Sequence, residues 1–341
     1  MKRIAVVLLL LVIVGAGGAA GAAWWFVNTP VSSSTAEVIV DIPKGAGSHA
    51  IAEQLVEQGL VRNAVAFRYY VKFRKAGSAL RAGEFRFRRD LTPSQVLETI
   101  LKGDVVLHKI TVPEGLAAKD ISTLVEASGL GSGAEFLRLT DDAVFARSLG
   151  VPADRLEGYL YPDTYAFEKG AGARTIAATM VKHFQQVWTP EIAAKAKALG
   201  LDEHRAVTLA SIVEKETGVP EERAIIAGVF YNRLTKGMKL ESDPTIIYGM
   251  KEYRGNIHKA DIHDPANVYN TYVIKGLPPG PIASPGGDAL RAVAEPAKHD
   301  WIFFVANGEG RHVFAATLQE HVRNVERYQL RHATPKKSRP G

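Results

Sequence analysis

The stretch Leu209-Ala-Ser-Ile-Val-Glu-Lys-Glu-Thr217 has the spacing of a helix with one buried face. At 100° per residue, Leu209, Ile212 and Val213 form a single apolar stripe, and Glu216 lies in the middle of it. A carboxylate on a buried face is costly unless it is paired or protonated, and loss of water raises its pKa. Glu216 is therefore a candidate proton donor near neutral pH, although a helix-end Glu paired with an Arg gives the same pattern.

The N-terminal segment has the composition of a membrane-crossing helix. Residues 4–27 carry no charged side chain, and as a helix they cover roughly 36 Å, enough to cross a bilayer. A Lys-Arg pair precedes them, and the run Trp24–Phe26 ends them where an aromatic belt lies. We expect residues 1–3 in the cytoplasm, 4–27 as a single-pass transmembrane helix in the bilayer of the cell inner membrane, and the rest in the periplasm. A signal peptide cleaved near Ala20-Gly-Ala22 is the alternative.

Charge and cysteine content narrow the range of partners and chemistry. The net charge is +6 and the chain has no cysteine, so disulfides and thiolate chemistry do not arise. Part of the positive charge lies in residues 331–341, a basic tail that we expect to be disordered. No basic stripe interleaved with aromatics stands out beyond residues 68–89, and the expected location is extracytoplasmic, so we expect no nucleic-acid partner. An acidic polymer or anionic lipid fits better.

A strand–turn–helix unit occurs twice in the first half of the chain. Its first copy begins Val40-Asp-Ile-Pro-Lys-Gly45 and its second Ile110-Thr-Val-Pro-Glu-Gly115, and in each a glycine, Gly59 or Gly129, is placed to end the helix. Between the copies, Glu84-Phe-Arg-Phe-Arg88 alternates as a strand does, and Thr92-Pro93 is a helix start. We therefore expect a polar linker at 28–37 and a compact βααβα module at 38–104.

Later segments combine aromatic rings with carboxylates and amides, as a sugar-binding groove requires. Rings cover the apolar faces of sugars, and polar side chains bind their hydroxyls. These segments are Leu156–Tyr165, Val229–Leu234, Leu240–Tyr248, Tyr269–Tyr272 and the Pro- and Gly-rich loop Gly276–Gly286. The predicted substrate-binding residues are Glu157, Tyr161, Asp163, Asn232, Asp243, Thr245, Tyr269, Asn270 and Tyr272. For Asn270, the alternative is that its side chain only ties down its own loop.

No cofactor or metal site is expected. His258, Asp261, His263 and Asp264 cluster in one short polar loop. A zinc site needs ligands on rigid elements, so a solvated turn is the favoured interpretation. We see no phosphate-cradling glycine loop and no Ser-His-Asp arrangement.

In their order along the chain, these segments closely resemble the YceG-like family of endolytic murein transglycosylases. The matching residues are Leu156–Tyr165, Ala210–Thr217, Ser242–Gly249, Tyr269–Tyr272, Gly276–Gly280, Phe303–Ala306 and the series His312, Thr317, His321. The resemblance implies an α+β fold: an N-terminal transmembrane helix, a small LysM-like βα module at 38–104, and a mixed α/β YceG-like catalytic domain at 105–330. It also implies that Glu216 is the catalytic acid.

The resemblance further implies lytic transglycosylation of peptidoglycan. Glu216 would protonate the oxygen of the MurNAc-GlcNAc β-1,4 bond within nascent glycan strands. It would then take the proton from the MurNAc 6-hydroxyl, which attacks the anomeric carbon and leaves a 1,6-anhydroMurNAc end. Such an enzyme would act as a terminase of glycan elongation, with a peptidoglycan synthase as a candidate partner.

Two alternatives stay open at this point. A retaining or inverting glycosidase needs two carboxylates at a set separation. Glu214 points away from the stripe that carries Glu216, so it cannot be that partner, but Glu157, Asp163 or Asp243 could make the chain a hydrolytic muramidase. The chain could also be a non-catalytic peptidoglycan-binding scaffold, although a binding protein has no need of a desolvated acid.

Overall fold

The computed structural model describes residues 2–330, so the predicted disordered tail at 331–341 lies outside the described residues. The fold is mixed α+β, mostly helical, with three two-stranded sheets among the described residues. The chain divides into two compact units. Unit 1 comprises the chain up to His108 together with Ala166–Lys169, and unit 2 comprises Lys109–Tyr165 and the chain from Gly170 onward.

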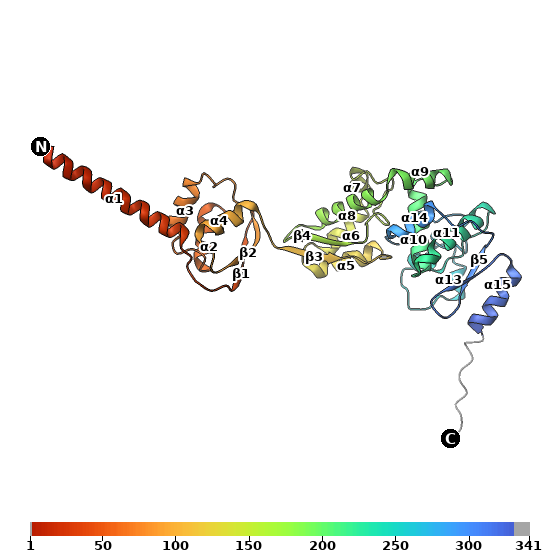
Figure 1. Cartoon of the computed structure of the whole chain (residues 1–341). Helices are drawn as coiled ribbons and strands as arrows, with labels where there is room; N and C mark the ends of the chain where they lie inside the picture. The colour runs from red at the N-terminus through yellow and green to blue at the C-terminus, as the bar shows by residue number, and fades with distance from the viewer. Residues whose placement is uncertain (1, 331–341) are drawn as a thin grey trace, which may run out of the picture. The chain divides into compact units, whose positions relative to one another are not determined.

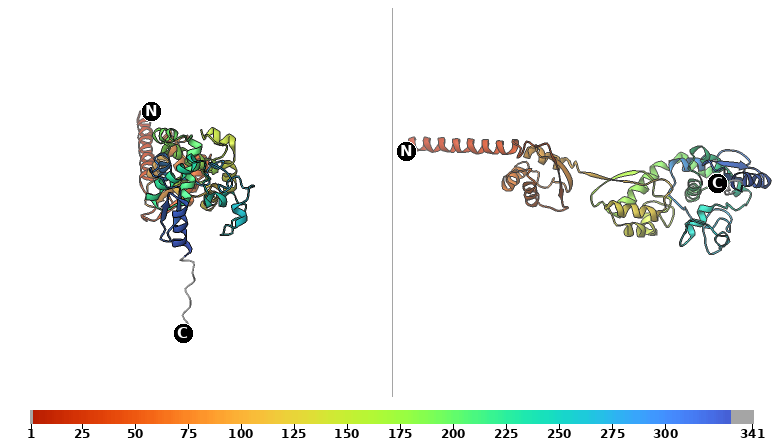
Figure 2. Two further views of the ribbon diagram at one scale, coloured as in Figure 1. Left: turned by 90° about the vertical axis from the view of Figure 1, so that its right-hand side faces the viewer. Right: turned by 90° about the horizontal axis from the view of Figure 1, so that it is seen from below.

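Unit 1 contains the apolar N-terminal helix and the small module that follows it. Its elements are α1 (Lys2–Asn28), β1 (Glu37–Ile42), α2 (Ser48–Glu57), α3 (Ala64–Phe73), β2 (Gly83–Arg88) and α4 (Pro93–Lys102). The βααβα order predicted for the module is confirmed. Helix α1 extends away from the rest of unit 1 (Figure 1 and Figure 2). Over Arg3–Asn28 it is long and apolar enough to cross a membrane.

The core of the module forms between one sheet and three helices. Strands β1 and β2 are antiparallel, with Val40 opposite Phe85 and Val38 opposite Phe87. Both phenylalanines are fully buried, as their alternation in the sequence predicts. The start predicted for α4 is also confirmed, because Thr92 caps it in a reciprocal capping box with Gln95. The positions of these elements thus follow from local sequence signals.

The rest of the described chain is mostly helical. Its elements are β3 (Leu107–Thr111), α5 (Ala118–Ser128), α6 (Gly133–Thr140), α7 (Ala143–Ser148), β4 (Thr164–Glu168), α8 (Ala173–Val187), α9 (Pro190–Ala198), α10 (Glu203–Glu216), α11 (Pro220–Thr235), α12 (Asp243–Gly249), α13 (Lys259–Ile262), α14 (Gly287–Ala294), β5 (Phe303–Ala306), β6 (His312–Ala315), α15 (Leu318–Val325) and a π-helical turn η1 (Glu326–Leu330). Strand β3 pairs with β4, and β5 pairs with β6. The second predicted strand–turn–helix unit is present as β3 and α5, and it ends at Gly129 with the left-handed backbone seen at Gly59.

Helix α10 is the central element of unit 2. Every residue from Ala206 to Val213 is buried, because α9, α11, α12 and α14 all contact this helix. The sequence predicts a single buried stripe, and in this respect the prediction is wrong. All faces of the middle of α10 are covered, so no side chain there reaches solvent.

The Pro- and Gly-rich loop packs on the same helix and closes the core of unit 2. The backbone N–H of Ile282 donates to Ser211 Oγ of α10 at 3.0 Å. Gly158 packs against Pro281 of this loop, and its φ of +84° lies in the left-handed region. A Cβ at Gly158 would collide with the Pro281 ring and lie 3.0 Å from Val207 Cγ1 of α10. Glycine is therefore required here both by the backbone conformation and by the close approach of the loop.

We predict that Gly158→Ala destabilises unit 2 much more than Gly200→Ala. Gly200 has a nearly equal φ of +85°, but a Cβ there would meet nothing within 4 Å. Both variants lose about 1–2 kcal/mol from the left-handed backbone, and Gly158→Ala loses about 1–3 kcal/mol more from overpacking. Urea denaturation of the two purified variants measures the difference, and equal losses would contradict the packing assigned to Gly158.

Candidate functional site

Glu216 is the last residue of α10, and its side chain lines a cavity of about 490 Å³. The wall of this cavity is formed by residues of α10 and α11, the segment 240–243, Tyr272, strands β5 and β6, and the C-terminal helical segment. The elements come from well separated parts of the sequence. Glu216 therefore lies where the buried helix α10 ends at the cavity. A molecule bound in the cavity can contact its carboxyl group.

One hydrogen bond fixes the Glu216 carboxyl group. Ser242 Oγ donates to Glu216 Oε1 at 2.5 Å. Ser242 stands at the N-cap position of α12, yet its hydroxyl makes no capping bond, although serine is among the preferred capping residues. Its hydroxyl serves Glu216 instead. The start of α12 therefore lacks the capping hydrogen bond that Ser242 could make. Such a loss of local stability is typical of a residue that serves a functional site.

The surroundings of Glu216 give its carboxyl group an unusual pKa. Burial raises the pKa to about 7, and the nearby charge of Asp243 acts in the same direction. The hydrogen bond from Ser242 and the positive charge of Arg233 oppose this increase. Near neutral pH, Glu216 is therefore present in both protonation states, so it can donate a proton in one step and accept one in the next.

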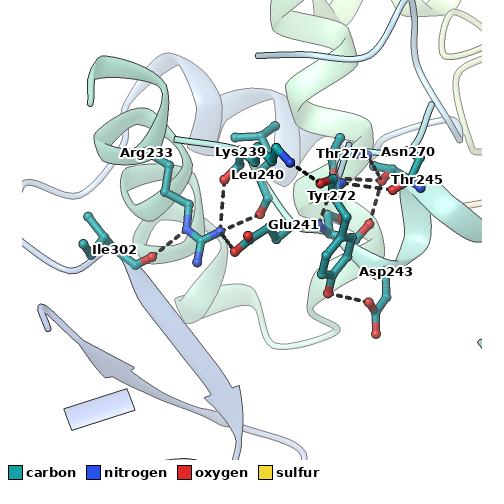
Figure 3. Close-up of polar contacts among 11 residues, drawn as sticks. Arg233, Lys239, Leu240, Glu241, Asp243, Thr245, Asn270, Thr271, Tyr272 and Ile302 are labelled. Atoms are coloured by element: carbon teal, nitrogen blue, oxygen red, sulfur yellow. Dashed lines mark hydrogen bonds and ion pairs between the residues drawn. The ribbon is translucent and has the colours of Figure 1, made fainter. Parts of the chain in front are cut away.

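The buried side chain of Arg233 holds the turn 239–241, which immediately precedes Ser242 (Figure 3 shows Arg233 and this turn). Arg233 of α11 donates through Nη1 to the carbonyls of Lys239 and Leu240 and, at 3.0 Å, to Glu241 Oε2. Its Nε donates to the carbonyl of Ile302 at 2.6 Å. Glu241 has a φ of +52°, one of two positive values at non-glycine residues in the described chain. Arg233 thus stabilises a strained turn immediately before Ser242.

A second set of bonds holds Ser242 through Thr271 of the loop 261–272 and Thr245 of α12. Its backbone N–H donates to Thr271 Oγ1 at 2.9 Å, and its carbonyl accepts from Thr245 Oγ1 at 2.6 Å. Thr245 and Thr271 are fully buried, and their hydroxyls lie 2.9 Å apart. The predicted site residue Thr245 therefore does not line the cavity, and it supports Ser242, which in turn binds Glu216.

Asn270 belongs to the same loop and is also fully buried. Its amide nitrogen donates to the carbonyls of Asp261, Ile262 and Asp264, and its amide oxygen accepts from the backbone N–H of Tyr272 at 3.0 Å (Figure 3 shows the last residue pair). All of these partners are backbone atoms of its own loop. The arrangement favours the alternative in which Asn270 ties down this loop.

Asp243 and Tyr272 are the predicted binding residues that share the cavity with Glu216. Tyr272 donates its hydroxyl to Asp243 Oδ1 at 2.7 Å. Burial raises the pKa of Tyr272, so its hydroxyl stays protonated at neutral pH. Asp243 is exposed at the start of α12. These two side chains offer a carboxylate and an aromatic ring to a bound molecule.

Glu157 and Tyr269 lie in a separate polar cluster. The Glu157 carboxylate accepts from the backbone N–H of Ala118 and, at 3.0 Å, from the hydroxyl of Tyr248. Burial raises its pKa to about 7. The Tyr248 and Tyr269 rings meet edge to face, with centroids 4.7 Å apart. None of these residues lines the Glu216 cavity.

The remaining predicted binding residues also lie outside that cavity. The Tyr161 ring packs against His183 at a centroid distance of 4.6 Å, and Asp163 Oδ2 lies 3.3 Å from His183 Nδ1. Asn232 of α11 donates its side-chain amide to the carbonyls of His299 and Trp301. A direct role of these residues in binding stays a prediction.

Glu214 does point away from Glu216, but not into solvent. Its side chain is only 6% exposed and pairs with Arg223 at 3.2 Å. It also accepts from the backbone N–H of Gly286 at 3.0 Å. The sequence prediction did not foresee this burial, because α10 is covered on all sides and not along one stripe. Glu214 joins α10, α11 and the Pro-rich loop.

Several residues that line or adjoin the cavity were not among the predicted site residues. Ser242, Arg233 and Glu241 lie in segments that were singled out, but only the neighbouring polar residues were taken as the site. Arg233, Glu241, His312 and His321 line the cavity, whereas Ser242 contributes through its hydrogen bond to Glu216. The His312 ring lies 2.7 Å from Glu222 Oε2, and the His321 ring stacks on Phe303 at a centroid distance of 5.0 Å. The only local signal was a serine before Asp-Pro, which predicts an N-cap.

The polar loop with His258 contains the short helix α13. Within the described residues, no group of three or more His, Cys, Asp or Glu side chains is placed to hold a metal ion.

Comparisons with known proteins assign the chain to a family. The sequence model of the YceG-like family matches residues 40–327. The endolytic murein transglycosylase of Bacillus subtilis (strain 168) is 31% identical over 311 residues, which cover 86% of each chain. The endolytic murein transglycosylase of Streptococcus pneumoniae serotype 2 (strain D39) is 31% identical over 326 residues, 86% of this chain and 59% of that protein.

A solved structure gives the same result. The crystal structure of a yceG-like protein from Listeria monocytogenes superposes with a TM-score of 0.58 at 31% sequence identity, over 85% of this chain and 99% of that one. The family match spans most of the chain, and the relatives align with it over nearly the same length. The chain therefore belongs to the YceG-like family.

Proposed function

We propose that this protein is a membrane-anchored, endolytic peptidoglycan lytic transglycosylase. It would cleave the MurNAc-GlcNAc β-1,4 bond within nascent glycan strands, leave a 1,6-anhydroMurNAc end and so act as a terminase of glycan elongation. The observation that carries the proposal is the Glu216 carboxyl group, which lines a cavity and has a pKa raised to about 7 by burial. The name shared by the relatives supports the same activity.

The chemistry proposed for Glu216 needs no water. In the first step, protonated Glu216 donates its proton to the glycosidic oxygen, and the bond from that oxygen to the MurNAc anomeric carbon breaks. In the second step, the Glu216 carboxylate takes the proton of the MurNAc 6-hydroxyl, whose oxygen bonds to the anomeric carbon. Glu216 ends protonated and ready for another cycle. Ser242 Oγ, at 2.5 Å, stabilises the carboxylate between the two steps.

The other carboxylates near the cavity favour transglycosylation over hydrolysis. A hydrolase needs a second carboxylate free to act on water or on the sugar. Glu241 is paired with Arg233 at 3.0 Å, and Asp243 accepts from Tyr272 at 2.7 Å. Glu157 and Asp163 do not line the cavity. Of the carboxylates considered from the sequence, Asp243 alone is left for the muramidase alternative.

The membrane location is part of the proposal. Helix α1 has the length and composition to cross a bilayer, and the Lys-Arg pair at its start favours a cytoplasmic N-terminus. The part of unit 1 that follows α1, and unit 2, would then face the periplasm from the inner membrane, where nascent glycan strands are made. A peptidoglycan synthase remains a candidate partner.

The products of glycan digestion test the activity. We expect the full-length protein to release glycan fragments with 1,6-anhydroMurNAc ends and Glu216→Gln to lower their rate of formation by about 10²–10⁴-fold, because an amide cannot donate the proton. Mass spectrometry of the fragments distinguishes the alternatives. Reducing ends would indicate a muramidase, and the absence of cleavage by the wild-type protein would indicate a binding scaffold.

Glu221→Gln is the matched control for this substitution. It makes the same chemical change at the start of α11, where the side chain is 71% exposed and outside the cavity, so activity should stay within about twofold of wild type. The fold of Glu216→Gln is checked by its stability, which should exceed that of wild type at high pH. The folded-state pKa of Glu216 is raised from 4.5 to about 7, so wild type loses stability as pH rises between these values. Below pH 4.5, the stabilities of wild type and Glu216→Gln should become equal.

The pH dependence of the rate tests the role of Glu216 as an acid. Because the proton donor must be protonated, kcat/KM should fall about tenfold per pH unit above its pKa, which is about 7. Ser242→Ala removes a hydrogen bond that lowers this pKa, so the fall should move to higher pH. Initial rates across the neutral range give both profiles, and a fall that stays in place in Ser242→Ala would contradict the assignment.

Asn270→Ala and Tyr272→Phe should have opposite effects. Asn270→Ala leaves buried loop carbonyls without partners, which costs about 1–3 kcal/mol, so we expect a lower melting temperature with activity per folded molecule largely kept. Tyr272→Phe removes only the hydroxyl that lies beside Asp243 in the cavity, so activity should fall with little change in melting. Calorimetry and rate measurements on both variants check this. A reversed pattern would make Asn270 a direct sugar ligand.

A further inference from the structure

Helix α3 of unit 1 exposes an apolar stripe. Val65, Tyr69 and Phe73 follow one another at intervals of four residues and are 56%, 69% and 84% exposed, so they lie on one face of the helix. The opposite face carries Phe67 and Val71, which are buried in the core of unit 1. Helix α3 therefore presents large apolar side chains on both faces, and only one of them is covered.

This stripe lies beside the end of the apolar helix α1. A hollow of about 930 Å³ is lined on one side by the last residues of α1, from Ala20 to Asn28, and on the other by Tyr69, Tyr70 and Phe73. Figure 1 shows α3 next to the point where α1 enters the module. Along the axis of α1, the exposed rings of α3 thus lie beside the final turns of this helix and not beyond its end.

The end of α1 is fixed to the module by several contacts. Phe26 packs against the unit 1 core. The Arg62 guanidinium lies 4.8 Å from the centroid of the Trp25 ring, and it donates to the carbonyls of Thr29 and Pro30. The geometry between α1 and α3 is therefore set by packing, a cation–π contact and hydrogen bonds, rather than by a free linker.

A basic edge runs along the apolar stripe. Arg68, Lys72 and Lys75 line a second hollow of about 520 Å³, which they share with Val65 and Tyr69. Helix α3 contains no acidic residue. Arg74 is paired with Glu98 at 2.7 Å, but no such pair within 4.0 Å is found for the three cations at this edge in the described chain. Exposed aromatic rings next to unpaired cations are typical of protein surfaces that bind the headgroup region of a membrane.

We propose that this face of α3, formed by Val65, Tyr69, Phe73, Arg68 and Lys72, together with Lys75 in the turn after the helix, lies in the headgroup region of the membrane and binds anionic phospholipids. The inference rests on the proposed anchoring by α1. If Trp24 lies at the headgroup level, Ala20 is roughly 6 Å deeper along the helix axis. Tyr69 and Phe73 share a hollow with both residues, so they reach the interface as soon as α1 spans the bilayer.

The absence of native cysteine makes a direct test practical. Single-cysteine variants of the full-length protein, labelled with a fluorophore, are reconstituted in vesicles of phosphatidylcholine and phosphatidylglycerol. The label sits at Phe73→Cys, at Val12→Cys within α1, or at Ile39→Cys. Ile39 is 52% exposed on β1, which lies on the side of unit 1 away from α1 (Figure 1). Nitroxides on lipid headgroups and on acyl chains report which label contacts lipid.

We expect headgroup nitroxides to quench the Phe73→Cys label at least about twofold more strongly than the Ile39→Cys label. Acyl-chain nitroxides should quench the Val12→Cys label. An unquenched Val12→Cys label would mean that α1 does not span the bilayer, and the proposed anchoring would fail together with this inference. A quenched Val12→Cys label with Phe73→Cys no more quenched than Ile39→Cys would overturn the inference alone.

Two further measurements separate lipid from other occupants. If Phe73→Cys is shielded from a water-soluble quencher but not reached by lipid nitroxides, another protein or a second copy of the chain covers the face, and the proposal is wrong. For the basic edge, we place Lys72→Glu and Lys75→Glu in the Phe73→Cys background. Quenching by headgroup nitroxides should fall about twofold or more in vesicles with phosphatidylglycerol and change little in pure phosphatidylcholine. Equal changes in both would exclude recognition of anionic headgroups.

Discussion

The burial of α10 on all sides is the constraint on which the candidate site depends. A helix covered by four others cannot tilt or slide without opening the core, so the residue at its end is held in place by packing. Glu216 is that residue, and it meets the cavity at the point where the cover ends. The same burial removes water from its carboxyl group and raises its pKa to about 7. Position and proton affinity thus have one physical cause.

The surrounding loops give up local stability to serve this carboxyl group. Ser242 leaves the N-terminus of α12 without a side-chain cap, and Glu241 adopts a left-handed backbone. Each departure costs on the order of 1–2 kcal/mol. Both persist because Arg233 binds the turn from one side and Thr271 binds it from the other. Two unfavourable local conformations side by side, next to the Glu216 carboxyl group, are what a functional turn would show, and this supports the proposed site.

The parts of this structure that the sequence predicted depend on local signals. The charge-free N-terminal run, the alternation of Phe85 and Phe87 and the Thr92 cap each act within a few residues, and each is found. The helical projection of Leu209–Thr217 singled out Glu216, which the structure places at a cavity, and its role as the catalytic acid stays a prediction. The contacts that the sequence did not predict join segments that come together only in the folded chain. Ser242 is 26 residues from Glu216, and Glu214 is buried by the loop at Gly286. Neither contact leaves a periodic pattern.

A raised pKa alone does not distinguish the proposed acid, Glu216, because Glu157 also has a pKa raised to about 7 by burial. The two carboxyl groups differ in what surrounds them. Glu157 is 7% exposed and accepts from Ala118 and Tyr248, so no face of it is open to a substrate. One oxygen of the Glu216 carboxyl group accepts a hydrogen bond from Ser242, and the side chain lines a cavity. Desolvation supplies a proton near neutral pH, but access decides whether it can be transferred. Glu216 combines the two conditions.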